Sequence, residues 1–126
     1  GPEIARLKKE TMGLILEGNV HFEPFTNDLI SYYKTCDLFL LTSNYEGYGM
    51  TLVEASLAGA KIISTDVGVA PDILLPDNIV PVGDKKSLAI KIFAALEGNV
   101  GSPRIPIYQT KEEYLRLYRD SLEKCL

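Results

Sequence analysis

The sequence contains no tryptophan, one histidine and two cysteines, and it has no long apolar run. Cys36 and Cys125 lie far apart and outside any CxxC spacing, so they predict neither a zinc site nor a disulfide framework and favour a reducing cytoplasm. No stretch approaches the roughly 18 apolar residues of a membrane span, and no secretory signal is recognisable. The 13 basic residues are spread along the chain, which argues against a nucleic-acid surface.

The length and composition of the chain predict one folded domain. The chain has 126 residues, too few for two ordinary domains. Hydrophobic residues make up 46% and charged residues 24%, which is enough apolar surface for a core and an average charge content. The formal net charge is −4, so the protein is mildly acidic.

Predicted strands and helices alternate along the chain. The expected helices are 3–16, one capped by Thr26 or Asn27, 50–58, a short one opened by Pro71, one capped by Asp84, and 110–125; the expected strands are 20–22, 37–41, 62–64 and 79–82. This order predicts an α/β, Rossmann-like parallel sheet with helices on both faces. Pro81 places the last strand at or near an edge.

Several burial patterns can be predicted from the same segments. Leu29, Ile30 and Tyr33 are expected to point inward from their helix. Strand 37–41 is an uninterrupted apolar run, typical of a strand covered on both faces. On the helix capped by Asp84, the expected inward stripe is Leu88, Ile92, Phe93 and Leu96.

The chain opens with a helix and carries only four short predicted strands, whereas a freestanding doubly wound domain opens with a strand. We therefore expect residues 1–126 to be the latter part of a Rossmann-like domain, without the N-terminal portion of that domain.

The run 43–55 is the segment that points to chemistry. Glu46 and Glu54 stand eight residues apart, with a Gly-Tyr-Gly turn between them, directly after strand 37–41. A strand that breaks into a glycine turn and then starts a helix is a common ligand site of α/β proteins. Two carboxylates there indicate a partner rich in hydroxyl groups, a sugar or a ribose. Taken alone, either glutamate fits a solvated carboxylate as well.

The helix that starts near Gly49 predicts what lies between the two polyol groups. Its first N–H groups, from about Met50 and Thr51, are free to bind an anion at the positive end of the helix. Gly47 and Gly49 let a ligand approach the backbone closely. The segment therefore suits a nucleoside diphosphate sugar, with the sugar at Glu46, the phosphates at the helix start and the ribose at Glu54.

The same segment resembles the retaining glycosyltransferases of family 4, the glycosyl transferases group 1, which have the two-domain GT-B fold. Their donor domain carries an E-x7-E motif in the setting S-x-x-E-G-[FY]-G-x4-E-A-x-A-x-G. This sequence matches it at Ser43, Glu46, Gly47, Tyr48, Gly49, Glu54, Ala55 and Gly59. Segments from 1–2 to 79–84 resemble other parts of that domain, so the similarity covers nearly the whole chain. Pro24, Val69 and Asp72 depart from the family pattern.

The resemblance implies roles for individual residues. Glu46 would contact the donor sugar and stabilise its developing positive charge, and Glu54 would bind the ribose. Gly47, Tyr48, Gly49, Met50 and Thr51 would hold the sugar and phosphate, and the backbone around Phe22 and Phe25 would frame the base. The family needs neither a metal nor another cofactor, and the donor is its substrate.

The resemblance also implies partners. The acceptor would bind a missing N-terminal domain, toward which helix 110–125 would pack, and any membrane association would depend on that missing part. Residues 42–60 contain no lysine or arginine, so we expect this chain alone to bind donor weakly and to be inactive.

Three other interpretations remain. A GT-B epimerase acting on a nucleotide sugar would share the donor site. A non-catalytic nucleotide-sugar binding module or a degenerate interaction module would keep the fold without turnover. A response-regulator receiver would need a phospho-accepting aspartate at the end of a strand, whereas Asp37 begins one.

Overall fold

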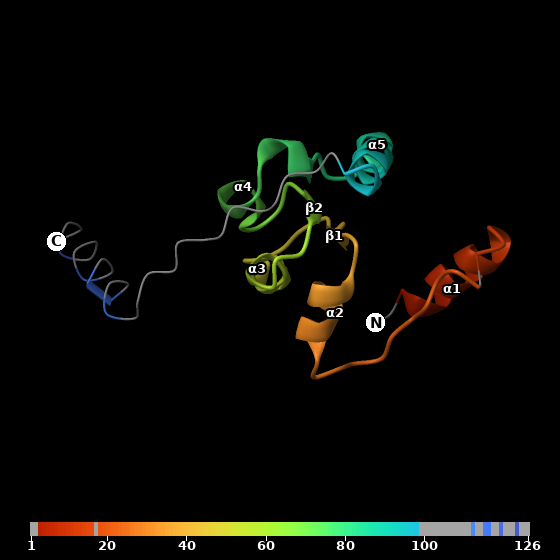
Figure 1. Cartoon of the computed structure of the whole chain (residues 1–126), viewed down its shortest axis with the longest axis horizontal. Helices are drawn as coiled ribbons and strands as arrows, with labels where there is room; N and C mark the ends of the chain where they lie inside the picture. The colour runs from red at the N-terminus through yellow and green to blue at the C-terminus, as the bar shows by residue number, and fades with distance from the viewer. Residues whose placement is uncertain are drawn as a thin grey trace.

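The computed structural model describes residues 3–16 and 18–98, together with five helical positions further on, Glu112, Leu115, Arg116, Arg119 and Glu123. The connector 98–109 and the predicted helix 110–125 otherwise lie outside the described residues. Figure 1 shows the order of the elements along the chain.

A parallel sheet of three strands forms the centre of the described structure. Its order is β1 (Phe39–Leu41), β2 (Ile62–Thr65) and β3 (Ile79–Val80), with Phe39 opposite Ile62 and Ser64 opposite Ile79. Parallel neighbours need a crossover, which α3 (Met50–Leu57) supplies between β1 and β2. The predicted edge position of the strand that precedes Pro81 is confirmed.

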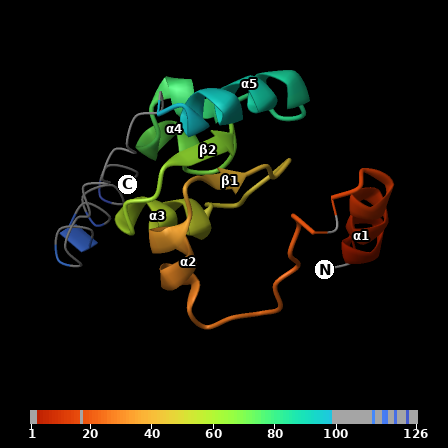
Figure 2. The same ribbon diagram turned by 45° about the vertical axis from the view of Figure 1, so that its right-hand side comes forward.

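Helices cover both faces of the sheet, which confirms the predicted α/β class (Figure 1 and Figure 2). α2 (Leu29–Thr35) and α3 lie on one face, and α5 (Lys85–Leu96) lies on the other. Successive residues of β2 alternate between the two layers: Ile62 packs with Leu52 of α3, whereas Ile63 packs with Ala95 of α5. The short helix α4 (Ala70–Ile73) joins the layer of α3, and the 3-10 turn η1 (Pro76–Asn78) leads into β3.

Local signals in the sequence explain where two of these helices begin and end. Gly59 follows α3 with a φ of +81°, as expected for a glycine that ends a helix. The Asp84 side chain accepts hydrogen bonds from the backbone N–H of Ser87 (3.0 Å) and from its hydroxyl (2.7 Å), so the predicted cap of α5 is confirmed. These two bonds lower the pKa of Asp84, because they stabilise its charged form.

α5 presents a different stripe to the sheet from the one predicted. Ile92 and Leu88 pack against β2 and β3 together with Ala95, whereas Phe93 is 71% exposed and Leu96 is 64% exposed. Positions 88, 92 and 95 follow the i, i+4, i+7 spacing of one helix face, and this face excludes position 93.

Residues 20–22 do not form the predicted strand, and residues 20–26 have no regular secondary structure. In the described part of the chain, no strand lies beside them to complete a hydrogen-bonded ladder, and a β-strand depends on such pairing.

The next two elements are also less buried than predicted. α2 is capped by Asp28, not by Thr26 or Asn27, and it buries only Tyr33, whereas Leu29 and Ile30 are exposed. β1 is covered only in part, since Leu40 is 38% exposed. The sequence pattern identified both elements, but how deeply each is buried depends on which other elements pack against it.

α1 (Ile4–Gly13) lies apart from the sheet and buries none of its residues (Figure 1). Ion pairs from Arg6 to Glu3 and Glu10 run along its exposed surface, where such pairs contribute little stability. In the described ranges, no helix has the length and apolar character to cross a membrane.

Replacing Leu52 with alanine should destabilise the fold by about 2–5 kcal/mol, because this fully buried side chain fills the layer between α3 and β2. Leu57→Ala is the matched control on the same helix, where the side chain is 57% exposed and the loss should be small. Urea unfolding followed by circular dichroism measures both. Equal losses for the two variants would contradict the observed packing.

Candidate functional site

The candidate site lies where the chain leaves β1 and β2 at the carboxyl end of the sheet. The loop 42–49 follows β1 and leads into α3, and the loop 66–69 follows β2 and leads into α4. In open parallel sheets ligands bind outside this edge. The loop 42–49, which holds most of the segment that points to chemistry, therefore lies where a ligand is expected.

Hydrogen bonds to backbone carbonyl groups hold the loop after β1 against the end of β2 and the loop that follows it. Val69 N–H donates to the carbonyl oxygen of Tyr48 (2.8 Å), and the buried Thr65 hydroxyl donates to the carbonyl of Ser43 (2.7 Å). Gly68 has a φ of +51°, and a Cβ atom there would lie 2.4 Å from the Tyr48 carbonyl oxygen. Only glycine fits this close approach.

Glu46 is held by its own loop. The Ser43 hydroxyl donates to Glu46 Oε1 at 2.7 Å, and the side chain is partly buried. A Cβ at Gly68 would lie 3.2 Å from the Cβ of Glu46, so the second loop also limits where this side chain can lie. The carboxylate is thus oriented before any ligand arrives, and Oε2 accepts no hydrogen bond from the described residues.

Gly49 begins α3 from a left-handed conformation, with a φ of +91°. Its carbonyl accepts from Leu52 N–H (2.9 Å), whereas the N–H groups of Met50 and Thr51 donate to no acceptor in the described part of the chain. Tyr48 and Met50 are each 56% exposed. The start of this helix is therefore open, as predicted, and can offer N–H groups to an anion.

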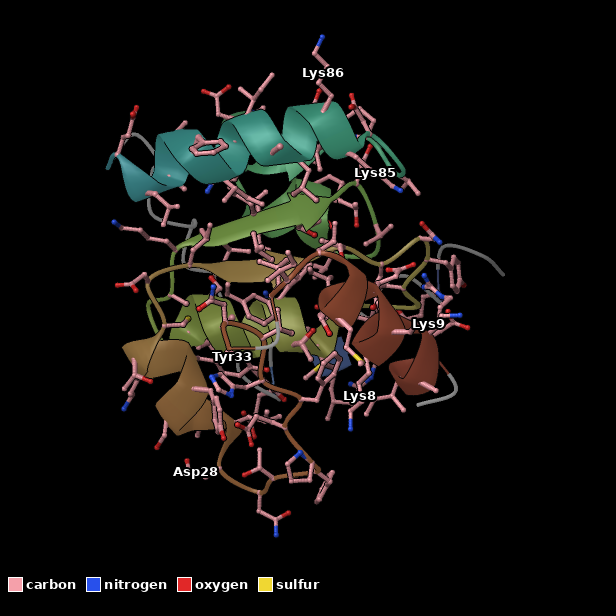
Figure 3. All side chains as sticks on the ribbon, turned by 90° about the vertical axis from the view of Figure 1, so that its right-hand side faces the viewer. Lys8, Lys9, Asp28, Tyr33, Lys85 and Lys86 are labelled. Carbon is pink, nitrogen blue, oxygen red and sulfur yellow. The ribbon has the colours of Figure 1, made fainter. Side chains whose placement is uncertain are left out.

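Glu54 lies on α3, and its carboxylate is held by a residue of α2. Tyr33 Oη donates to Glu54 Oε2 at 3.2 Å, and Figure 3 shows the Tyr33 side chain reaching from α2 toward α3. Tyr33 is buried, and its ring stands edge-on to Phe39 of β1, with ring centres 5.3 Å apart. Burial raises the pKa of the Tyr33 phenol, and the bond to Glu54 and its charge raise it further.

A cavity of about 590 Å³ lies between residues 23–26, α2 and β1. Pro24, Tyr33 and Thr51 are among its lining residues, so it reaches the first turn of α3. Phe22 and Phe25 do not line it: Phe25 is 90% exposed, and the Phe22 ring lies 5.6 Å from the ammonium of Lys8. Their predicted part in framing a base stays a prediction.

Glu46 lies in the loop that leads into α3, and Glu54 lies in α3 itself. In the described residues their carboxylates have different hydrogen-bond partners, Ser43 for Glu46 and Tyr33 for Glu54. In the described ranges neither carboxylate forms an ion pair, and no group of three or more His, Cys, Asp or Glu residues could hold a metal ion. Lys85 lies at the start of α5 (Figure 3). Together with Thr42 and Asn44 it lines a smaller cavity of about 290 Å³.

The contact between Tyr33 and Glu54 is the feature of this site that the sequence pattern missed. The two residues are 21 positions apart. A tyrosine on an amphipathic helix gives no signal of the carboxylate that its hydroxyl will reach, so only the packing of α2 on α3 reveals the pair.

Comparison with known proteins gives one consistent family. Residues 1–113 match the family model described as glycosyl transferases group 1. The chain is 39% identical over 62 residues to mannosylfructose-phosphate synthase of Agrobacterium fabrum, covering 48% of this chain and 14% of that protein. It is 29% identical over 100 residues to N-acetyl-alpha-D-glucosaminyl L-malate synthase of Bacillus anthracis, covering 77% of this chain and 26% of that protein.

A solved structure is similar in fold. Sucrose-phosphate synthase from Thermosynechococcus elongatus superposes with a TM-score of 0.71 at 26% identity, over 79% of this chain and 26% of that one. The chain therefore spans about a quarter or less of the length of these three proteins.

Replacing Gly68 with alanine should destabilise the fold more than replacing Gly59 does. Both have a positive φ, which costs alanine about 1–2 kcal/mol, but only position 68 adds a clash with the Tyr48 carbonyl, since nothing lies within 4 Å of a Cβ at Gly59. Thermal unfolding of both variants separates the two costs. Equal losses would show that the loops are not closely packed.

The Tyr33 phenol should ionise above the ordinary tyrosine pKa of about 10. Because the folded state holds this proton more tightly, the stability that Tyr33 contributes is present below that pH and is lost as the pH rises through the raised pKa. Glu54→Gln should lower the Tyr33 pKa by removing a negative charge. Tyrosinate absorbance, taken as the difference between each protein and its Tyr33→Phe variant, measures the shift; an unchanged midpoint would contradict the contact.

Proposed function

We propose that this chain, which belongs to the glycosyl transferases group 1 family, forms the donor-binding face of an enzyme that transfers a sugar from a nucleoside diphosphate sugar to an acceptor with retention. One observation carries the proposal: an open helix start at the carboxyl end of a parallel sheet has one held carboxylate, Glu46, in the loop before it and a second, Glu54, in the helix that it begins. The GT-B type of fold supports the same conclusion.

Each part of such a donor has a chemical counterpart in the site. The pyrophosphate would accept from Met50 and Thr51 N–H at the positive end of α3, and the glycines at 47 and 49 leave room beside the backbone. Glu54 would accept hydrogen bonds from the ribose hydroxyls. Glu46 would do the same for the sugar, with Ser43 fixing its orientation.

In the proposed reaction the bond between the anomeric carbon and the phosphate oxygen breaks, and the acceptor hydroxyl oxygen bonds to the same face of that carbon. The hydroxyl proton passes to the leaving phosphate oxygen. Positive charge develops on the sugar ring as the first bond breaks, and the carboxylate of Glu46 stabilises it electrostatically. The donor is a substrate, and the proposal involves no metal or other cofactor.

The charge balance of the site limits what this chain does alone. Residues 42–60 supply two carboxylates but no lysine or arginine, so helix N–H groups would face the diphosphate unaided. We propose that an acceptor-binding domain and basic residues elsewhere in the enzyme complete the site. The names of two relatives mention mannosyl and N-acetylglucosaminyl groups. We therefore propose that the donor is a nucleotide derivative of a hexose.

To test the proposal, the chain is titrated with UDP-glucose, GDP-mannose and ADP-glucose, and with the matching nucleoside diphosphates. The NMR signals of its backbone amides report the binding and give the affinity. Glu54→Gln should weaken both classes of ligand, because both carry the ribose. Glu46→Gln should weaken only the nucleotide sugars. A charge-assisted hydrogen bond of about 1.5–3 kcal/mol corresponds to a loss of about tenfold to a hundredfold.

Glu97→Gln is the matched control, because Glu97 is an exposed carboxylate at the far end of α5. It should leave the affinity unchanged. The proposal would be refuted if a saturating ligand shifted no backbone amide signal between positions 43 and 54. Equal effects of the three substitutions on the affinity would refute it as well.

A further inference from the structure

We infer that Tyr33 is a positioning residue for Glu54 and thereby sets how tightly the site holds a ribose. The inference rests on the proposed function, because it assumes that Glu54 binds the ribose. It adds a residue from α2 to a site that otherwise belongs to α3 and the loops after β1 and β2.

The environments of the two partners differ in a way that favours this role. Tyr33 is only 4% exposed, and its ring is fixed edge-on against Phe39, so its hydroxyl has little freedom to move. Glu54 is exposed on the surface of α3, and among the described residues the one hydrogen-bond partner of its carboxylate is Tyr33, at 3.2 Å. A rigid buried donor thus holds a side chain that would otherwise be mobile.

Holding the carboxylate before the ligand arrives improves binding for an entropic reason. A free glutamate side chain occupies several rotamers and loses that freedom when it binds. A side chain already in place loses less, so more of the interaction energy appears as affinity. The tyrosine hydroxyl uses one acceptor position on Oε2, and Oε1 and the remaining lone pairs stay available for vicinal hydroxyl groups.

The alternative is that Tyr33 only fills the core beside α3. Its ring does pack there, in the same cluster as Leu52 and Val53. The hydroxyl can be separated from the ring, because Tyr33→Phe keeps the packing against Phe39 and removes only the hydrogen bond to Glu54. A packing role would therefore be insensitive to which hydroxyls the ligand carries.

The experiment compares Tyr33→Phe with Tyr32→Phe, a neighbouring tyrosine on α2 that is 47% exposed. The probes are UDP, GDP and ADP and their 2′,3′-dideoxy analogues, with affinity measured by NMR titration of the full chain. Tyr33→Phe should weaken binding of the ribose forms by about two- to tenfold. It should leave the dideoxy forms unchanged, and Tyr32→Phe should alter neither.

A double-mutant cycle with Glu54→Ala provides the second measurement. In that background Tyr33→Phe should have no further effect on the ribose forms. An equal loss for ribose and dideoxy forms, or the same loss with and without Glu54, would overturn the inference in favour of a packing role. The unaltered chain gives a test independent of folding: ribose forms should shift the Tyr33 ring signals, and dideoxy forms should not.

The outcomes separate the inference from the function on which it rests. Suppose that the Glu54→Ala variant prefers the ribose forms over the dideoxy forms by the same affinity ratio as the unaltered chain. In that case Glu54 does not bind the ribose, and both the proposed ribose contact and the inference fail. If the preference for ribose forms is lost in Glu54→Ala but kept in Tyr33→Phe, only the inference is wrong.

Discussion

The close approach of the loop after β2 to the loop after β1 is the constraint on which the rest of the site depends. The Tyr48 carbonyl lies so near Gly68 that no side chain fits between them, and the hydrogen bond from Val69 closes the contact. This contact fixes the backbone that leads into Gly49, and Gly49 in turn aims the first N–H groups of α3 outward. The same contact confines Glu46. The position of one carboxylate and the exposure of the helix start therefore have a common cause.

The second carboxylate depends on a different part of the fold. Glu54 takes its orientation from α2, which packs on α3 through Tyr33. The two ends of the site are thus supported independently, one by contacts between loops and the other by contacts between helices. A polar group held by a rigid neighbour loses less freedom when a ligand binds, so both arrangements favour preorganisation.

The parts that sequence could predict are those encoded within a few residues. The start and end of α3 and the cap at Asp84 follow from local residue chemistry, as does the placement of Glu46 beside an open helix start. Predictions failed where a distant neighbour decides the outcome. Residues 20–22 have strand composition but no paired strand, and Phe93 has the right residue type on the wrong side of its helix. The bond from Tyr33 to Glu54 joins two elements and leaves no trace in either.

β1 ends the sheet on one side, and in the described part of the chain no strand covers its outer edge. The peptide groups along that edge keep hydrogen-bonding capacity, and Leu40 leaves apolar surface beside them. Such an edge is a template for adding another strand, including one from a second molecule. Self-association should therefore limit the solubility of this polypeptide as its concentration rises, and a lysine at an exposed position of β1 would counter it.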